Sequence, residues 1–176
     1  MSGNRAGSQG RTTAVDDALA PTLKSALRNL VRSVVVVTAQ VDGRPFAMAA
    51  TAVSEVSMDP PSMLVCINRN AAIFQAIDAG SDLMLNVLSA DHEAVSRACG
   101  GGVRGGERFA IGHWEDAVEG RPPFLRDACA VIHLKQANVV DHGSHRVVIG
   151  DVLSVTLPSA LPPLAYFDGR YVQVAA

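Results

Sequence analysis

Short, apolar, β-branched runs separated by turn residues dominate this chain, and they do not alternate steadily with helices. "SVVVVTAQ" (33–40) and "FAMAATAV" (46–53) flank a "VDGRP" turn, which is the pattern of a β-hairpin. Three more β-rich stretches follow residue 128: "CAVIHLKQANVV", "HRVVIGDVLSVTL" and "PLAYFDGRYVQVA". Many strands with few helices favour a barrel over a doubly wound sheet. We therefore predict a mainly β (α+β) barrel with a few short helices.

The predicted helices are short and lie in the first 100 residues. The stretch 15–31 has a helical period that places Leu23, Leu27, Leu30 and Val31 on one face. A second helix over 71–80 ends at Gly80, and a third over 89–100 has Ser89 as its N-cap. Between them, "SMLVCIN" (62–68) and "DLMLNVL" (82–88) are predicted strands, the first apolar enough to be buried on both faces.

Length and charge exclude several classes of protein. The 176 residues, 48% of them hydrophobic, fit one domain over 16–176 after a flexible polar tail over 1–15. With 15 basic and 17 acidic residues the formal net charge is −2, and there is no basic stripe for nucleic acid or an anionic membrane. No apolar run reaches the ~20 residues of a membrane span, and residues 1–21 lack the apolar h-region expected of a secretory signal. We expect a cytoplasmic protein.

Three cysteines support the same location. Cys66, Cys99 and Cys129 are odd in number, far apart and never in a C-x-x-C pair. This spacing argues against a disulfide framework or a zinc ribbon and for reduced thiols. We expect each cysteine to be a small buried hydrophobe.

A glycine-rich segment contains a formal nucleotide-binding motif. Gly100, Gly102 and Gly105 satisfy G-x-G-x-x-G. The dinucleotide fingerprint must follow a strand and open a helix, whereas this one follows a predicted helix and opens a loop. We interpret it as a false match within a long functional loop.

The stretch "VVDHGSHRVVIGDV" (139–152) places two histidines in a hairpin turn. Turn chemistry favours Asp, Asn, Gly and Ser and does not call for imidazoles. His142 and His145 form H-x-x-H beside Asp141, but a turn presents no fixed face and no third ligand stands out. Metal is the weaker interpretation, and we expect none. His133 lies within a strand pattern and is expected to be structural.

A second unusual stretch runs from residue 46 to residue 74. Ala47, Ala49, Ala50 and Ala52 give a strand so little side chain that another backbone or a flat ligand can approach its N–H groups. Tight packing between sheets is the bland alternative. The turn "NRNAA" (68–72) follows at a strand end and a helix start, where N–H groups and an arginine collect anions. A flat row of amides beside an anion pocket suits a flavin nucleotide.

From about residue 22 onward the chain resembles the short-chain flavin reductases, the small components of two-component flavin-dependent monooxygenases. Within that family it is most similar to the reductases of 4-hydroxyphenylacetate 3-monooxygenases. The matching motifs are "VVVVTA" with its DG turn, "AATAVSEVSMDPPSMLVCINRNA", "LMLNVLSADHEAVSRACGG", "RFAIGHW", "GSH" and "YFDGRYV". Each motif alone is weak, but their order is specific.

The resemblance implies a split β-barrel of the FMN-binding type that binds flavin at a homodimer interface. It assigns the isoalloxazine ring to residues 49–56 and the ribityl chain and phosphate to residues 68–72. The implied cofactor-binding residues are Ala49, Ala50, Thr51, Ala52, Val53, Ser54, Glu55, Val56, Asn68, Arg69, Asn70, Ala71, Ala72, Arg108, Phe109, His145 and Tyr171.

Two departures from the family pattern affect particular contacts. The family's acidic residue before the turn histidine is Ser144 here, and its Thr and Ser positions in the flavin segment are Ala49 and Ala52. Backbone N–H groups are then the donors to flavin at those two positions.

The implied activity is NADH- or NADPH-dependent reduction of FMN or FAD, with the reduced flavin supplied to a partner monooxygenase, directly or by diffusion. His145 is the expected catalytic residue, close to flavin and nicotinamide, while His142 is expected to face solvent. Two alternatives stay open: a split-barrel flavoprotein that retains its flavin and acts on another small molecule, and a non-enzymatic flavin-binding module.

Overall fold

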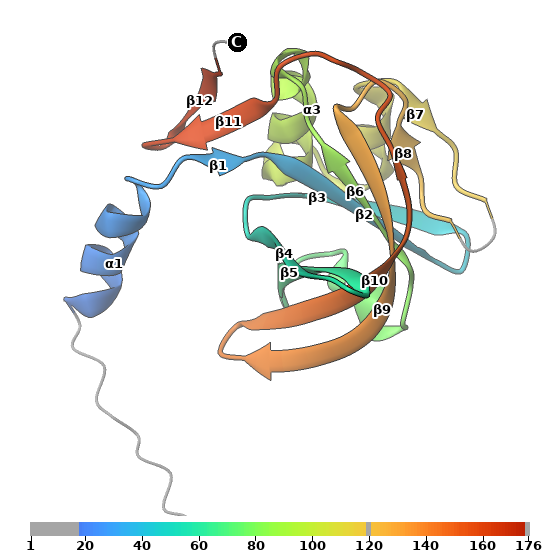
Figure 1. Ribbon diagram of the computed structural model, residues 1–176, viewed down its shortest axis with the longest axis horizontal. Coiled ribbons are helices and arrows are strands. Elements are labelled where there is room, and N and C mark those ends of the chain that lie inside the picture. Colours follow the sequence, from blue (N-terminus) through green and yellow to red (C-terminus); the bar gives the residue numbers. More distant parts are fainter. Residues whose placement is uncertain (1–17, 119–120, 175–176) are drawn as a thin grey trace, which may run out of the picture.

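One seven-stranded antiparallel sheet forms the body of the protein. The structure, a computed structural model, describes residues 18–118 and 121–174; the tail predicted for residues 1–15 lies outside them. The strand order is β3-β2-β6-β9-β10-β5-β4, and β11 and β12 form a smaller sheet with β1 (Figure 1). The mainly β prediction is therefore confirmed.

The strands follow the predicted runs closely. The large sheet consists of β2 (Val35–Val41), β3 (Arg44–Ala50), β4 (Val53–Met58), β5 (Pro61–Asn68), β6 (Leu83–Val87), β9 (Ala130–His142) and β10 (His145–Thr156). The small sheets consist of β1 (Arg32–Ser33), β11 (Leu164–Phe167) and β12 (Arg170–Gln173), and of β7 (Trp114–Glu115) and β8 (Phe124–Leu125).

The helices are short. They are α1 (Leu19–Leu27), α2 (Phe74–Asp78) and α3 (Glu93–Arg97), with 3-10 turns η1 (Ala90–His92) and η3 (Gly105–Ala110) and one π turn η2 (Ala98–Gly102). Gly80, with φ 79°, follows α2 as predicted. Ser89 caps η1 in a capping box whose second member is His92, so the predicted N-cap is also confirmed.

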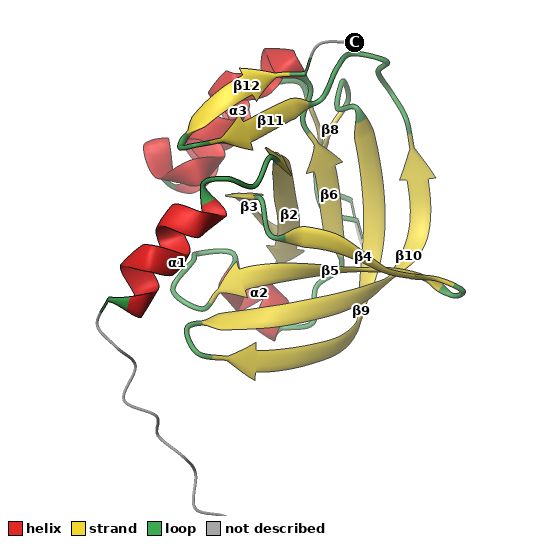
Figure 2. Cartoon of the chain, turned by 60° about the vertical axis from the view of Figure 1, so that its left-hand side comes forward, coloured by secondary structure: helices red, strands yellow, loops and turns green. Residues whose placement is uncertain are grey.

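The sheet curls into a barrel that stays open along one seam. Register shifts near Gly150 and Val152 let β10 bend around the core with β9 (Figure 2). A Cβ at Gly150 would lie 3.0 Å from the Leu134 Cβ and from the Lys135 carbonyl oxygen, so a side chain here would force its neighbours to shift. The strands β3 and β4 end the sheet on its two sides and do not pair with each other. The barrel is therefore split between them.

Two apolar clusters pack against the two opposite faces of β2. Val35 and Val37 face the interior cluster with Ile67, whereas Val34 and Val36 face the cluster beneath α3 and η2. The strand buried on both faces is thus β2. The prediction that 62–68 has this property is wrong, because residues 63, 64 and 66 of β5 are only half-buried. The strands β4 and β10 pair with the two edges of β5, so they do not cover the face on which Leu64 and Cys66 lie.

The predicted apolar face of the first helix is uncovered. Leu23 is 55% exposed and Leu30 is 51% exposed, and no residue of α1 is buried. The helix projects from the body of the protein (Figures 1 and 2). Its hydrophobic period therefore predicts a helix correctly but indicates a surface that packs on nothing within the described chain.

The cysteines are all free thiols. Cys99 is buried, and this burial raises the pKa of its thiol to about 11. Cys66 and Cys129 are only half-buried, so the expectation of full burial holds for one of the three. Within the described ranges, no helix is both long and apolar enough to cross a membrane.

Candidate functional site

The segment 49–56 crosses the open seam of the barrel. It leaves the edge strand β3, passes through Thr51 and Ala52, and enters the edge strand β4. An edge strand pairs on one side only, so every second N–H group points away from the ladder. The Ala52 carbonyl accepts a hydrogen bond from the Cys66 N–H at 3.0 Å, which fixes the crossing point against β5.

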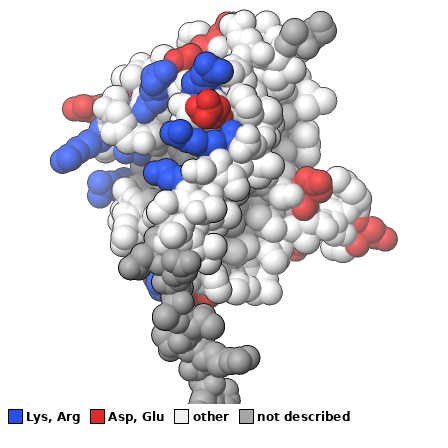
Figure 3. Space-filling view, turned by 90° about the vertical axis from the view of Figure 1, so that its left-hand side faces the viewer, with Lys and Arg blue, Asp and Glu red and all other residues white. Residues whose placement is uncertain are grey.

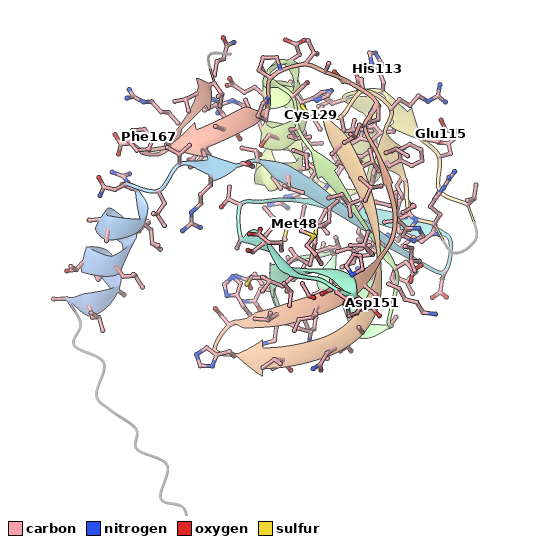
Figure 4. The ribbon with its side chains drawn as sticks, in the orientation of Figure 1. Met48, His113, Glu115, Cys129, Asp151 and Phe167 are labelled. Carbon is pink, nitrogen blue, oxygen red and sulfur yellow. The ribbon has the colours of Figure 1, made fainter. Side chains whose placement is uncertain are left out.

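Two cavities meet at Thr51. One, of about 350 Å³, is lined by Thr51, Val53, Ser54 and Glu55 from the crossing segment, together with residues of β1, β2 and β6. The other, of about 180 Å³, is lined by Ala49, Ala50, Thr51, Ser96, Tyr166 and Tyr171, together with Val34. Met48, a residue of β3 (Figure 4), packs against the interior cluster. The crossing segment is therefore a wall shared by both cavities.

Tyr171 reaches this wall from β12. Its hydroxyl lies 2.9 Å from the Ser96 Oγ, and its ring packs edge-on against Tyr166 with centroids 5.3 Å apart. The Arg97 guanidinium lies over the same ring at 4.9 Å. These contacts hold the tyrosine in one orientation beside Ala49 and Ala50.

The turn 68–72 meets the tip of the β9–β10 hairpin. Asn68 is the register partner of His145, and the Arg69 N–H donates to the Ser144 carbonyl at 3.0 Å. The Arg69 guanidinium donates to the Gly143 carbonyl at 2.5 Å. Two segments expected to contact flavin are thus one connected unit.

These contacts change two details of the predicted anion pocket. The Arg69 guanidinium already has a partner in the hairpin. The helix α2 begins only at Phe74, because Ala71 and Phe74 form turns with the residues before them. Residues 68–72 therefore present turn N–H groups and not the first turn of a helix.

The two turn histidines differ in their contacts. His142 and His145 face each other across the hairpin as register partners, and both are exposed. The Nδ1 of His145 lies 2.9 Å from the Ser144 Oγ, so the residue that replaces the family's acid fixes this ring. In the described part of the chain, no group of three His, Cys, Asp or Glu residues is arranged to hold a metal.

Arg146, which the sequence analysis did not single out, anchors the same hairpin. Its guanidinium bonds both Asp141 carboxylate oxygens, at 2.7 and 3.0 Å, and the Asp78 carboxylate at 2.8 Å. It also lies 4.7 Å from the centre of the Phe74 ring. These hydrogen bonds raise the pKa of Arg146 and lower that of Asp141. The sequence offers one signal for this role of Arg146: it directly follows the G-x-H turn and lies five residues after Asp141.

Arg108 and Phe109 lie in η3, which contacts β3 through the bond from Arg108 to the Ala47 carbonyl. The Arg108 guanidinium donates to the carbonyls of Ala47, Val103 and Gly105, so it fastens the glycine-rich loop to the strand that leads into the crossing segment. Phe109 packs edge-on against Trp114 at 5.0 Å. The structure brings neither side chain to the two cavities at Thr51.

The structure also shows the positions of the glycine-rich motif and of His133, to which the sequence analysis assigned no functional role. Gly100 and Gly102 lie in η2, directly after α3, and Gly105 starts η3, so the glycines do not join a strand to a helix. His133 is largely buried, and its Nε2 lies 2.9 Å from the Asp82 carboxylate. Both predictions, a false dinucleotide motif and a structural histidine, are confirmed.

A flavin fits the crossing segment by shape and by donor chemistry. The side chains at 49, 50 and 52 are methyl groups, so a flat ring can approach the backbone of an edge strand closely. Free N–H groups there would face the ring edge that gains negative charge on reduction. The turn 68–72 begins two residues after Cys66, which bonds Ala52, and its first residue pairs with His145. Neither the turn nor His145 lines the two cavities at Thr51.

Comparison with known proteins gives a family for the whole domain. A family model described as a flavin reductase like domain matches residues 27–175. The FMN reductase (NADH) RutF of Variovorax paradoxus (strain S110) is 35% identical over 153 residues, which are 87% of this chain and 84% of that protein. The reductase component of the FADH(2)-dependent resorcinol hydroxylase of Rhizobium sp. (strain MTP-10005) is 35% identical over 150 residues, covering 84% of this chain and 83% of that protein.

Solved structures agree with the sequence relatives. The flavin reductase PheA2 matches with a TM-score of 0.79 and 28% identity, over 92% of this chain and 99% of that one. The NADH:FAD oxidoreductase SgcE6 of Streptomyces globisporus C-1027 matches with a TM-score of 0.82 and 25% identity, over 93% and 98%. The split barrel, the crossing segment and these likenesses together identify the chain as a member of the flavin reductase-like family.

Proposed function

We propose that this protein uses NADH to reduce FMN or FAD and supplies the reduced flavin to a partner oxygenase. The observation that carries the proposal is the crossing segment 49–56, whose edge-strand N–H groups and methyl side chains border two cavities at Thr51. Relatives named as an NADH-dependent FMN reductase and as the reductase component of resorcinol hydroxylase support it. NADPH is the second candidate reductant.

The residues of this chain bind the flavin and the nicotinamide and orient them toward each other. Flavin and nicotinamide supply the hydride chemistry themselves. The backbone N–H groups of 49–56 stabilise negative charge at the ring edge, and the N–H groups of 68–72 hold the ribityl phosphate. His145, held by Ser144, orients the nicotinamide against the ring. No nucleophile is needed from the protein.

We further propose that the enzyme is a homodimer. The apolar side of α1, with Leu23, Leu27 and Leu30 exposed, gives a surface that a second copy would cover. The outer part of β10 adds Leu153 and Val155, each more than half exposed. Sedimentation should give a dimer, and a stable monomer that reduces flavin at the full rate would contradict a shared site.

We place the reaction in the cytoplasm, where three free thiols such as these stay reduced. The partner is a flavin-dependent oxygenase that receives the reduced flavin directly or by diffusion. A resorcinol hydroxylase component and BorF, the flavin reductase component of a two-component tryptophan halogenase, are relatives of this kind.

The testing experiment follows consumption of NADH and NADPH by the purified protein with FMN, FAD and riboflavin added in turn. Turnover that saturates with added flavin is the expected result. Tight copurified flavin without turnover would instead support a binding module. A bound flavin that is reduced at a rate independent of added flavin would support a flavoprotein that retains its flavin and acts on another small molecule.

A further inference from the structure

A buried histidine lies at the start of the helix that reaches the proposed flavin site. His92 ends η1 and directly precedes α3, and its side chain is only 7% exposed. Its Nδ1 accepts a hydrogen bond from the Ser89 N–H at 3.2 Å and lies 2.9 Å from the Ser89 Oγ. Because a ring nitrogen that accepts from an N–H carries no proton, the proton of the neutral ring is on Nε2.

This second nitrogen faces a carboxylate from another part of the chain. The His92 Nε2 lies 3.1 Å from the Asp127 Oδ1. Asp127 lies between β8 and β9, and its Oδ2 lies 2.9 Å from the Nδ1 of the exposed His113. The His92 ring therefore joins the capping box at the start of α3 to the connection that leads into the seven-stranded sheet.

The opposite end of α3 holds Tyr171. Ser96 follows His92 by four residues, so the two lie on the same face of the helix about one turn apart. Ser96 is buried, and its Oγ lies 2.9 Å from the Tyr171 hydroxyl. Ser96 and Tyr171 both line the 180 Å³ cavity beside the crossing segment. A shift of α3 would therefore move the tyrosine within this cavity.

The capping box and the contact with Asp127 have different roles. The capping box joins residues 89 and 92, so it fixes the shape of the first turn and not the place of the helix in the protein. Val95 buries α3 against an apolar cluster, but apolar packing is non-directional. Asp127 precedes a strand of the large sheet, whose edge strand β3 leads into the crossing segment. The contact between His92 and Asp127 therefore fixes α3 relative to that segment.

We propose that His92 is a positioning residue of the flavin site: anchored by Asp127, it fixes α3 and thereby the orientation of Tyr171 beside Ala49 and Ala50. The inference rests on the proposed function, since it takes Tyr171 as a residue that contacts flavin. His92 lines neither cavity at Thr51, so its effect passes through the helix and the tyrosine.

The experiment measures the dissociation constants of FMN and riboflavin for the full-length protein, and its free energy of unfolding in urea. The principal variant is His92→Gln, because glutamine is a usual partner in a capping box and so keeps the cap without the ring that faces Asp127. Asp127→Ala removes the same contact from the other side. Tyr171→Phe removes the hydroxyl that meets Ser96 and keeps the ring. The matched control, His113→Ala, removes the exposed histidine of the same carboxylate.

The variants are chosen to leave the cations of the protein in place. Figure 3 shows Lys and Arg side chains gathered on the face that carries α1 and the β11–β12 turn. Loss of a cation there would weaken any phosphate-bearing ligand through charge alone. Riboflavin has no phosphate, so a loss of affinity that FMN and riboflavin share reports contacts of the flavin ring and its ribityl chain.

We expect His92→Gln and Asp127→Ala each to weaken FMN and riboflavin binding about tenfold and by equal factors, as for residues coupled in one network. The two changes combined should lose no more than either alone. In the Tyr171→Phe background neither should weaken binding further, whereas their effect on the free energy of unfolding should persist. His113→Ala should keep wild-type affinity for both flavins, because exposed ion pairs contribute little.

Unchanged flavin affinity in both His92→Gln and Asp127→Ala, with or without lowered stability, would assign His92 to the fold alone and overturn the inference. A loss that persists in full in the Tyr171→Phe background would also overturn it, because the effect would not pass through the tyrosine. The expected pattern of binding in a protein that does not oxidise NADH would refute the proposed function and leave the role of His92 standing.

Discussion

Arg146 grips both oxygens of the Asp141 carboxylate, at 2.7 and 3.0 Å, directly beneath the turn that carries His145. Its third contact, with Asp78 at 2.8 Å, reaches the helix that follows the turn 68–72. One guanidinium therefore ties together the two segments that border the proposed flavin site. Both lie at the end of the β5–β10 pairing, where Asn68 is the register partner of His145.

Arg146→Ala should lower the rate of flavin reduction about tenfold, because misplaced reacting groups lose near-attack geometry. Arg146→Lys should recover little, since a lysine cannot bond one carboxylate through two N–H groups and reach a second. Stopped-flow reduction of bound flavin by NADH measures this step, with Lys135→Ala as the control cation. A rate unchanged in Arg146→Ala would show that the turn keeps its position without the arginine.

Arg69 gives a test that separates phosphate binding from hairpin support. If its charge acts on the ribityl phosphate, Arg69→Ala should weaken FMN binding by about ten- to a hundredfold and leave riboflavin almost unaffected. The contact with Gly143 suggests the second outcome to watch for, in which both flavins lose affinity together. Equal losses would assign Arg69 to the hairpin and not to the phosphate.

His145→Ala should reduce the hydride-transfer rate about ten- to a hundredfold while largely sparing affinity for oxidised flavin. The matched variant is His142→Ala, the register partner across the turn, which should change neither quantity. Stopped-flow traces with and without EDTA supply the measurement. Matching losses in both variants, reproduced by EDTA on the wild type, would replace the nicotinamide role with a metal.

The ion pair beneath the turn also predicts a pH dependence of stability. The Arg146 guanidinium lowers the pKa of Asp141 below its unfolded value of about 3.9. The stabilisation is therefore complete above about pH 4 and is lost as the pH falls through the lower, folded pKa. Thermal melts from pH 6 to pH 3 should show the gap between wild type and Asp141→Asn closing with acid. The matched control is Asp151→Asn, which replaces an exposed carboxylate on the neighbouring strand β10.

Asn86 offers a test of the fold that does not involve the site. It is fully buried; its Nδ2 donates to the Val36 carbonyl at 2.9 Å and its Oδ1 accepts from the Leu125 N–H at 2.8 Å. Asn86→Leu leaves both backbone groups unpaired and should cost about 2–4 kcal/mol. Urea unfolding measures the loss. A change below 0.5 kcal/mol, the range typical of surface substitutions, would mean that the two backbone groups find other partners.

Local pattern predicted much of this fold because the relevant interactions are local. The β-branched run of β2, the Gly143 turn and the Ser89 cap all depend on residues a few positions apart. The strand β4 escaped prediction because "VSEVSM" is mostly exposed and polar, which is typical of an edge and not of a core strand. Burial on both faces was assigned to β5 and belongs to β2, since apolar content does not report which neighbours a strand has.

The site was predictable as segments but not as contacts. Residues 49–56 and 68–72 follow from small side chains, turn residues and family resemblance. The bond from Arg69 to Gly143 spans 74 positions, and that from Arg146 to Asp78 spans 68. Hydrophobic periodicity depends on residues a few positions apart, so it cannot predict hydrogen bonds between residues this far apart in the sequence. Arg108 matches a family motif, yet three carbonyls of its own chain occupy its guanidinium.

The open seam between β3 and β4 has a consequence for handling the protein. Unpaired strand edges are templates on which another extended chain can add. From Ala49 through Ala52 the segment itself carries no charged or bulky side chain. If flavin binds at this segment as proposed, flavin and a foreign strand would compete for the same N–H groups, and bound flavin would oppose edge-to-edge aggregation. Preparations stripped of flavin should lose colloidal stability before they lose secondary structure.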